Sequence, residues 1–193
     1  MDRSSATVAF TADFSDPNTL VSLQDGSSVI GVEGVTFTGG TLGDTITSSD
    51  SATLSNIVLG GGGNDVLTGG AGRDVMTGGA GLDDFDFNAI AEMGKKASTR
   101  DIIKDFRHLQ DDIDLSTIDA NGSAAGNAAF KFLAAKGAAF TGVKGQLHWM
   151  QINVAGKAND KTIIEGDING DRKADFQIEL SGLVSLSKAD FIL

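Results

Sequence analysis

The sequence lacks cysteine and tyrosine, and it has a single proline and a single tryptophan among its 193 residues. Without cysteine there are no disulfide bonds and no thiol nucleophile, so stability has to come from packing or from a bound metal. Basic residues are also scarce, because 15 Lys and Arg face 26 Asp and Glu, for a net charge of -11. No basic stretch offsets this charge, and we therefore expect no nucleic-acid partner.

Long hydrophobic runs are missing as well. No apolar stretch approaches the length of a membrane span, and residues 1–5 lack the basic and then apolar profile of a secretory signal peptide. We expect no membrane span, and either a cytosolic protein or one exported by a route that does not read the N-terminus. The apolar content of 40% is enough for a real core in one domain or two small ones.

Catalytic motifs are absent too. The two histidines, His108 and His148, are forty residues apart, and neither a Gly-x-Ser-x-Gly motif nor a phosphate-binding P-loop occurs. We expect both histidines to be structural or surface residues. The chain itself is predicted not to be an enzyme, although a parent protein could carry a catalytic domain upstream.

Glycine is abundant, and it follows a strict register. From residue 60 the sequence reads GGGGNDVLT, GGAGRDVMT, GGAGLDDFDF, three copies of G-G-x-G-x-D-x-U-x in which U is apolar. Glycines allow positive φ and remove every Cβ from a tight turn, so successive carbonyl oxygens can face one centre. The aspartate adds an anionic oxygen, and Ca²⁺ prefers about six to eight such hard ligands. A flexible linker would need neither the aspartate nor the apolar residue in register.

Two imperfect copies precede the three exact ones. Residues 51–59 carry Asn56 at the aspartate position, and residues 39–47 carry Asp44 there, with Leu42 in place of a glycine and a three-residue insertion between the two copies. Phe37, nine residues before Ile46, is predicted to close the first rung. Calcium is less expected at these two turns than at the three downstream.

The repeat resembles the nonapeptides of RTX (hemolysin-type) calcium-binding proteins. The resemblance implies an all-β fold, a right-handed parallel β-roll followed by a C-terminal antiparallel sheet or sandwich, with successive turns on opposite edges. Asp65 should then share an ion with the Asp83 turn, and Asn56 with the Asp74 turn. Leu67, Met76 and Phe85 should point inward. The predicted metal ligands of the roll are Gly39, Gly40, Asp44, Asn56, Gly60, Gly61, Gly63, Asp65, Gly69, Gly70, Gly72, Asp74, Gly78, Gly79, Gly81 and Asp83.

The second half carries a wider resemblance. The strings DIIKDF, DDIDLS, GQLHW, GDINGDRKADFQIELSG and a terminal DFIL resemble the C-terminal domain of serralysin metalloproteases and related type I secreted proteins, over residues 39–193. The zinc motif of those proteases is not present. In that family a further calcium closes the roll, and the matching ligands here are Glu92, Asp101 and Asp111. The alternative is that Asp101 and Asp111 only blunt edge strands, because their segments alternate acidic and apolar residues as edge strands do.

Two segments allow two interpretations each. Residues 167–175 alternate oxygen-bearing side chains as calcium loops do, but Asn169-Gly170 favours a hairpin turn, and Ile178 stands where an EF-hand has glutamate. The next strand should point Phe176, Ile178 and Leu180 inward. Residues 183–193 are either a final strand or, by the resemblance, an uncleaved signal for a type I ABC exporter.

These observations predict a secreted, non-catalytic calcium-binding module. An acidic, glycine-rich chain should be unfolded without counter-ions and should fold on Ca²⁺ outside the cell, after bacterial type I secretion. We expect an N-terminal β cap at 1–38, the roll at 39–90, and a C-terminal β region with the secretion signal at 91–193, together forming the C-terminal part of a larger secreted protein. The alternatives are a remnant enzyme and a polysaccharide-binding module similar to the repeat modules of alginate epimerases. The latter needs a basic or aromatic stripe on the roll, for which 6% aromatics offer little.

Overall fold

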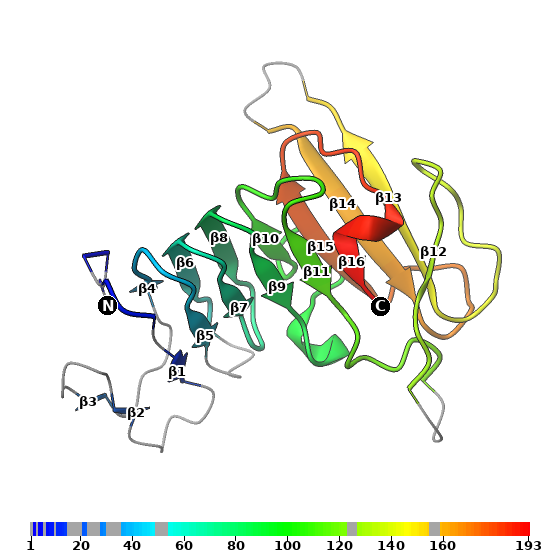
Figure 1. Ribbon diagram of the computed structural model, residues 1–193. Helices are drawn as coiled ribbons and strands as arrows, with labels where there is room; N and C mark the ends of the chain where they lie inside the picture. The colour runs from blue at the N-terminus through cyan, green and yellow to red at the C-terminus, as the bar shows by residue number, and fades with distance from the viewer. Residues whose placement is uncertain are drawn as a thin grey trace.

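Most of the protein is built from two β-sheets that face each other across the hydrophobic core (Figure 1). The computed structural model describes residues 2, 4–5, 7–9, 11–14, 21–22, 28–29, 36–48, 54–122, 127–154 and 159–193, with the backbone alone at 21–22 and 28–29. These residues contain no α-helix. They contain two short 3₁₀ helices, η1 (Ile90–Glu92) and η2 (Lys188–Asp190).

The strands fall into a larger sheet, a smaller sheet and a two-stranded ribbon. The eight-stranded sheet has the order β12 (Lys131–Phe132), β13 (Gln146–Ile152), β14 (Lys161–Asp167), β15 (Phe176–Ser181), β10 (Asp101–Ile103), β8 (Val75–Ala80), β6 (Ile57–Gly62) and β4 (Thr36–Thr38). The six-stranded sheet has the order β1 (Thr11–Asp13), β5 (Thr45–Thr47), β7 (Val66–Thr68), β9 (Asp84–Asp86), β11 (Asp112–Asp114) and β16 (Phe191–Ile192). The ribbon pairs β2 (Val21–Ser22) with β3 (Ser28–Val29).

From β4 to β11 the chain alternates between the two sheets, and every pairing of these strands is parallel. This alternation is a parallel β-roll, as predicted. Strands β5, β7 and β9 have three residues, because six of each nine form the turn, whereas β6 and β8 continue into the glycine turn and have six. Each strand pairs with the strand two repeats away rather than with its neighbour in sequence.

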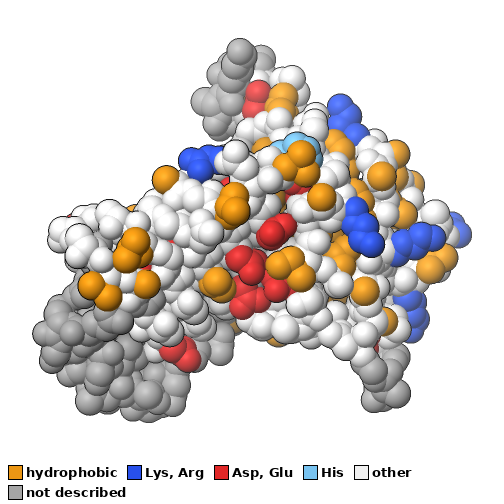
Figure 2. Space-filling model, in the orientation of Figure 1, with side chains coloured by type: hydrophobic (Ala, Val, Ile, Leu, Met, Phe, Trp, Pro, Cys, Tyr) orange, Lys and Arg blue, Asp and Glu red, His pale blue; other side chains and the backbone are white. Residues whose placement is uncertain are grey.

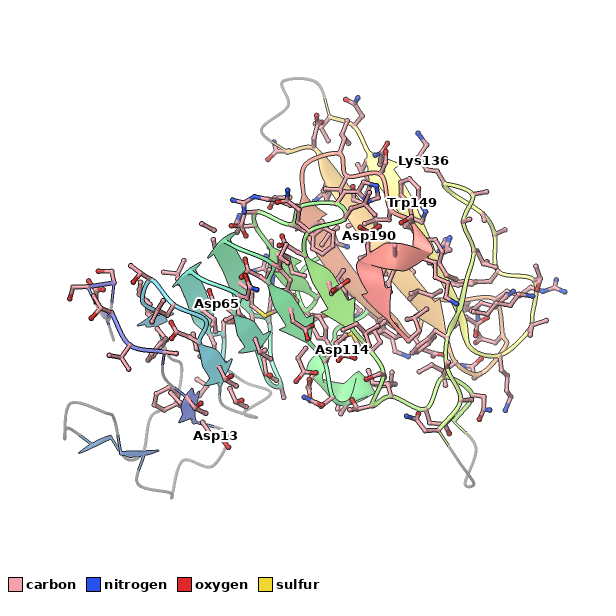
Figure 3. All side chains as sticks on the ribbon, viewed as in Figure 1. Asp13, Asp65, Asp114, Lys136, Trp149 and Asp190 are labelled. Carbon is pink, nitrogen blue, oxygen red and sulfur yellow. The ribbon has the colours of Figure 1, made fainter. Side chains whose placement is uncertain are left out.

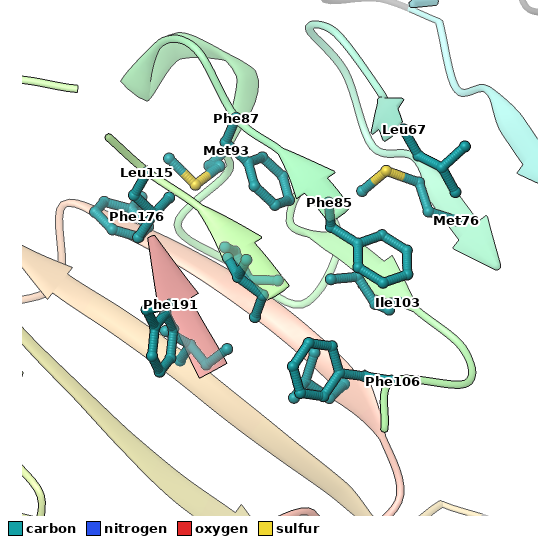
Figure 4. Packing of buried hydrophobic residues seen from close by; sticks show 14 of the residues in the cluster. Leu67, Met76, Phe85, Phe87, Met93, Ile103, Phe106, Leu115, Phe176 and Phe191 are labelled. Atoms are coloured by element: carbon teal, nitrogen blue, oxygen red, sulfur yellow. The ribbon is translucent and has the colours of Figure 1, made fainter. Parts of the chain in front are cut away.

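The apolar residue of each repeat lies between the two sheets (Figure 4). In register, Phe37 faces Val58 and Val58 faces Met76 in one sheet, while Ile46, Leu67 and Phe85 are stacked in the other. These six side chains have no exposed surface, which confirms the predicted inward positions. Full burial of such side chains stabilises a fold by about 1.5–3 kcal/mol each.

The C-terminal part continues both sheets of the roll. Strands β13, β14 and β15 form an antiparallel meander, as predicted, and β15 pairs in parallel with β10. The predicted inward residues Phe176, Ile178 and Leu180 are fully buried. Strand β16 pairs in parallel with β11, and its Phe191 belongs to the core.

The interpretation of the two acidic segments as edge strands is wrong. Strand β10 lies between β8 and β15, and β11 lies between β9 and β16, so both are interior strands. Their acidic residues alternate with apolar ones for another reason. The apolar residues face the core, and the acidic ones either face out of the sheet or lie in the turns at its ends.

The N-terminal β cap predicted at 1–38 contains the four strands β1 to β4 in its described residues. Strands β1 and β4 extend the two sheets of the roll at its upstream end, and the rings of Phe14 and Phe37 pack with their centroids 5.8 Å apart. Because the sheets begin before residue 39 and continue through β10 and β11, the proposed division at 38 and 90 stays a prediction. In the described part of the chain, no helix is long and apolar enough to cross a membrane.

Candidate metal sites

The turns of the roll form two opposite edges, because each strand carries the chain from one edge to the other. The first edge consists of residues 39–44, 60–65, 78–83 and the loop 104–111. The second edge consists of residues 54–56, 69–74 and 87–100. Every predicted ligand of the exact repeats lies in one of these turns (Figure 3, where Asp65 is labelled).

Aspartates form a continuous hydrogen-bonded ladder along the first edge. The amide of Asp44 donates to Oδ1 of Asp65 over 2.8 Å, and the amide of Asp65 donates to Oδ1 of Asp83 over 3.1 Å. The amide of Asp83 donates to Oδ1 of Asp111 over 3.2 Å. Each carboxylate therefore accepts from the aspartate one turn upstream on the same edge.

The second edge repeats this arrangement. The amide of Asn56 donates to Oδ1 of Asp74 over 2.6 Å, and the amide of Asp74 donates to Oδ1 of Asp101 over 2.7 Å. The structure thus brings Asp65 to Asp83 and Asn56 to Asp74, the two pairs named from the sequence. Whether each pair shares an ion stays a prediction.

The second carboxylate oxygens are the unusual feature of both edges. Oδ2 of Asp65, Asp74, Asp83 and Asp101 is buried and has no hydrogen-bond partner among the described residues. All four residues are at most 2% exposed. A buried anionic oxygen without a partner costs free energy, so these atoms need a cation or a proton.

The first glycine of each exact repeat leaves room beside this oxygen. A Cβ built on Gly60, Gly69 or Gly78 would come closer than 3.0 Å to Oδ2 of the aspartate five residues later in the same turn. Any other residue would therefore fill the space that the unpaired oxygen faces. The space and the donor set fit a hard cation such as Ca²⁺.

Backbone conformation separates the exact turns from the imperfect one at residues 39–44. The second and fourth positions of the three exact turns have positive φ, in Gly61, Gly63, Gly70, Gly72, Gly79 and Gly81. Gly40 and Leu42 occupy the same positions in the first turn and do not have positive φ. The imperfect turn therefore has a different backbone, and Oδ2 of Asp44 accepts from the amide of Gly40 over 2.7 Å instead of lacking a partner. Most of the turn before Asn56 lies outside the described residues.

Burial and like charges raise the pKa of the edge aspartates. Loss of hydration is the largest cause, and it raises the pKa of Asp65 and Asp74 to about 7 and that of Asp101 to about 8. The negative charges of neighbouring carboxylates add to this effect. Burial also raises the pKa of Asp83 and Asp111. Without a cation, ionising these groups at neutral pH opposes folding.

The structure separates the three ligands that the family resemblance assigns to the closing calcium. Glu92 lies on the second edge, where its charge contributes to the raised pKa of Asp74 and Asp101. Asp111 lies on the first edge beside Asp83, because β10 and the loop after it carry the chain across the roll. Asp101 and Asp111 are 0% and 2% exposed, so they do not merely blunt a strand. Glu92 and Asp101 close one edge, and Asp111 closes the other.

Asp105 is an edge residue that the sequence analysis missed. Its two carboxylate oxygens accept from the amides of Gly78 and Gly79, each over 2.9 Å. The spacing D-x-x-x-D in the strand that starts at Asp101 was the available signal, since a three-residue strand puts the two aspartates at opposite edges. Asp105 and Asp111 together fix the last turn of the first edge.

Conventional ligand clusters do not occur in the described part of the chain, where no three His, Cys, Asp or Glu side chains converge on one point. An ion on either edge would therefore be held mainly by backbone carbonyl oxygens of the glycine turns, with aspartate Oδ2 as the charged ligand.

The segment at 167–175 is a hairpin connection, as favoured from the sequence. It joins the antiparallel strands β14 and β15. Its carboxylates are used inside the turn, since Asp167 accepts from the amides of Gly170 and Arg172 over 2.7 and 2.9 Å, and Asp175 accepts from the amide of Ile168 over 2.9 Å.

Each histidine has a structural partner. His148 is buried on β13, and its Nε2 lies 2.8 Å from Oε2 of Glu165. His108 lies on the loop 104–111, and its Nδ1 is 2.7 Å from Oδ1 of Asp190. Among the described residues, the hydrogen-bond partners of both rings are carboxylates.

Comparison with known proteins agrees with this architecture. Residues 13–193 match the family described as Peptidase M10 serralysin C terminal. The chain belongs to this family. The family is of the RTX type, whose repeats generally bind Ca²⁺. No curated protein matches the chain.

Two solved structures are similar to it, both solution structures of subunits of the Azotobacter vinelandii mannuronan C5-epimerase. The AlgE6R3 subunit gives a TM-score of 0.55 at 20% identity, covering 100% of this chain and 84% of that one. The AlgE6R2 subunit gives 0.51 at 23% identity, covering 83% of this chain and 92% of that one. At these identities the likeness concerns the fold alone.

Proposed function

We propose that the chain is a non-catalytic calcium-binding module that folds on binding Ca²⁺ outside the cell. The observation that carries the proposal is the row of buried, unpaired Oδ2 atoms beside the glycine cradles of both edges. Calcium would supply positive charge there. The residues that would hold it on the first edge are the turns that end at Asp65 and Asp83, and on the second edge the turn that ends at Asp74 together with Asp101 and Glu92.

Folding and binding are linked by these contacts. Ordering the glycines and burying the carboxylates both cost free energy, and both costs fall on the folded state alone. A ligand that binds only the folded state stabilises it by about 2.7 kcal/mol per site when its concentration is a hundred times Kd. Extracellular calcium modules have Kd near 10⁻⁴ to 10⁻³ M, roughly, so the roll would be unfolded in calcium-poor cytosol.

A titration with Ca²⁺ followed by calorimetry and circular dichroism tests this proposal. At neutral pH we expect β structure to form only with calcium, and Asp74→Asn or Asp83→Asn to weaken binding and raise the calcium midpoint. Asp171→Asn is the matched control, because Asp171 is exposed and lies in the β14–β15 hairpin, away from both edges. An unchanged β spectrum in excess chelator would refute the proposal.

We further propose that residues 183–193 carry the signal for a type I ABC exporter and that the chain is the C-terminal part of a larger secreted protein. Family membership supports this. Residues 183–193 include η2 and the core strand β16, so the proposed signal would be part of the folded sheet. Deleting residues 190–193 should abolish export by a type I system in cells, while Lys188→Ala should not. Equal export of both variants would contradict the assignment of the signal.

A further inference from the structure

Charge is distributed very unevenly along the chain. Residues 1–90 contain two Lys and Arg and twelve Asp and Glu, whereas residues 91–193 contain thirteen and fourteen. The first part therefore has a net charge of -10 and the second a net charge of -1. Residues 120–159 contain no carboxylate side chain at all, but four lysines. A protein that is acidic overall thus has one region of the opposite sign.

The outward face of the six-stranded sheet is acidic. Asp84 faces Asp112 and Asp86 faces Asp114 in the register of β9 and β11. Burial and the charges of the other three raise the pKa of Asp84 to about 7. Figure 2 shows acidic side chains gathered on this side, and Figure 3 labels Asp114 among them. This face of the roll would repel a polyanion, so the expectation that an acidic polymer lies along the roll has no support here.

A basic patch lies at the other end of the molecule. It consists of Lys131, Lys144, Arg172 and Lys173, all exposed. The loop before β13 brings them together, because the amide of Lys131 donates to the carbonyl of Gly145 over 2.7 Å, and Gly145 in turn donates to the carbonyl of Asp167 over 2.8 Å. Figure 2 shows the basic side chains concentrated on the half of the molecule that carries β12 to β15.

Two glycine contacts confirm that the patch is continuous. A Cβ on Gly142 would lie 2.9 Å from Nε of Arg172, and a Cβ on Gly170 would lie 3.3 Å from Cγ of Lys144. The 140–145 loop and the β14–β15 hairpin therefore pack together with their cations on neighbouring positions. Val143 lies in the 140–145 loop beside Lys144, is 53% exposed, and adds apolar surface.

Three cations elsewhere in the C-terminal part have carboxylate partners. Arg100 and Lys161 pair with Glu179, and Lys95 pairs with Asp175. Within the described residues, no carboxylate lies within 4.0 Å of the four patch cations. The neighbouring Asp171 uses its Oδ1 to accept from the amide of Lys173. The patch therefore retains its charge for an external anion.

We propose that the basic patch binds an acidic polysaccharide. A polyuronate presents one carboxylate per sugar ring and apolar ring faces, which match spaced lysines and an exposed valine beside small residues. Duplex DNA carries one charge per about 1.7 Å, so the acidic roll would repel it much more strongly than it would repel a polyuronate. The inference rests on the folded C-terminal part but not on calcium as the folding ligand or on export.

A matched pair of triple variants tests the patch. K131Q/K144Q/K173Q removes three patch lysines, and K96Q/K104Q/K188Q removes three exposed lysines elsewhere, so both change the net charge equally. Arg172 is left in place because its φ of +69° belongs to the turn. Each protein, folded in Ca²⁺ as checked by circular dichroism, is titrated with mannuronate and galacturonate hexamers, which are too short to gel. Maltohexaose, a DNA duplex and anionic lipid vesicles are titrated in parallel.

Loss of three exposed ion pairs should weaken hexauronate binding by roughly tenfold in the patch variant. The control variant should bind within about twofold of the parent, and binding should fall as salt rises. Equal loss in both variants, or no binding of either hexauronate by the parent, would overturn the proposal. Tighter binding of DNA or vesicles than of hexauronate, lost in the same variant, would overturn the choice of occupant. A parent protein that does not fold in calcium would count against the proposed function rather than against the patch, and the single variants Lys131→Gln and Lys144→Gln replace the triple variant if that one does not fold.

Discussion

The calcium-free chain should become more stable as the solution is made more acidic. In the folded state the pKa of Asp65 and Asp74 is about 7 and that of Asp101 about 8, against an ordinary value of 3.8. Between these limits the folded chain holds more protons than the unfolded chain. Its stability is therefore greatest below the unfolded pKa and is lost as pH rises toward 7 or 8.

The size of the effect follows from the three shifts. Each aspartate contributes up to about 1.4 kcal/mol per pH unit inside the window, so the three together contribute at most about 4 kcal/mol per unit. Calcium reverses the sign, because an ion bound to Oδ2 requires the ionised carboxylate and acid then competes with it. The stability of the calcium-bound protein should therefore fall as the pH is lowered through the same interval.

Circular dichroism measures the folded fraction of the calcium-free chain, which should rise as the pH is lowered from about pH 7.5 to about pH 5.2, and urea unfolding measures the stability of the calcium-bound protein over the same range. The lower limit stays above the isoelectric point near 4.4, where the chain would precipitate. In the triple variant Asp65→Asn, Asp74→Asn, Asp101→Asn the pH dependence of the calcium-free protein should be reduced but not lost, because the raised pKa values of Asp83, Asp84 and Asp111 remain. An amide fits such a place, since Asn56 occupies the equivalent position and donates to the carbonyl of Gly69. A folded fraction of the calcium-free chain that is flat, or that rises with pH, would refute the reasoning.

Three further substitutions, each measured by urea unfolding in saturating calcium, test separate parts of the fold. Gly79→Ala puts a Cβ against the carbonyl of Gly61 at a φ of +104° and should lower the free energy of unfolding by more than about 2 kcal/mol. The control Gly182→Ala, at a φ of +92° with open space around it, should lower it by about 1–2 kcal/mol. Equal losses would show that the stacking of the turns is not tight. Asp190→Ala leaves two backbone amides and His108 without their acceptor and should cost about 2–4 kcal/mol, against almost nothing for Lys188→Ala. Met76→Ala should cost about 2–5 kcal/mol through the cavity it leaves, and Met76→Leu less than about 1.5 kcal/mol; a small effect of the first would mean that the roll collapses around the gap.

The roll could be predicted from sequence because its contacts repeat at a constant separation. Once the nine-residue period is recognised, the inward position of Leu67 and the pairing of Asp65 with Asp83 follow from counting. The imperfect copies could be aligned on the same count, since Ile46 and Val58 keep the apolar position. Even the different backbone of the first turn was marked by Leu42 in place of a glycine.

The rest depends on contacts that no local pattern records. Strand β15 joins β10 across more than seventy residues of chain, and β16 joins β11 in the same way. Without those pairings the acidic segments read as edge strands, because the strands that cover them come much later in sequence. The separation of Asp111 from Asp101 and Glu92 also follows from the three-dimensional topology. Strand β10 has only three residues, yet it carries the chain from the second edge of the roll to the first.

The aspartate ladder has a direction. Each turn is capped by a carboxylate that comes later in the chain, and the final caps, Asp101 and Asp111, belong to the part after the glycine repeats. A chain ending at residue 90 would leave the amides of Asp74 and Asp83 without these acceptors. The repeats are therefore not interchangeable units, and the last one depends on the strands and loops on its C-terminal side. We expect the turns of the roll to fold in sequence from the C-terminal end toward the N-terminal end, because each turn needs the carboxylate of the turn that follows it.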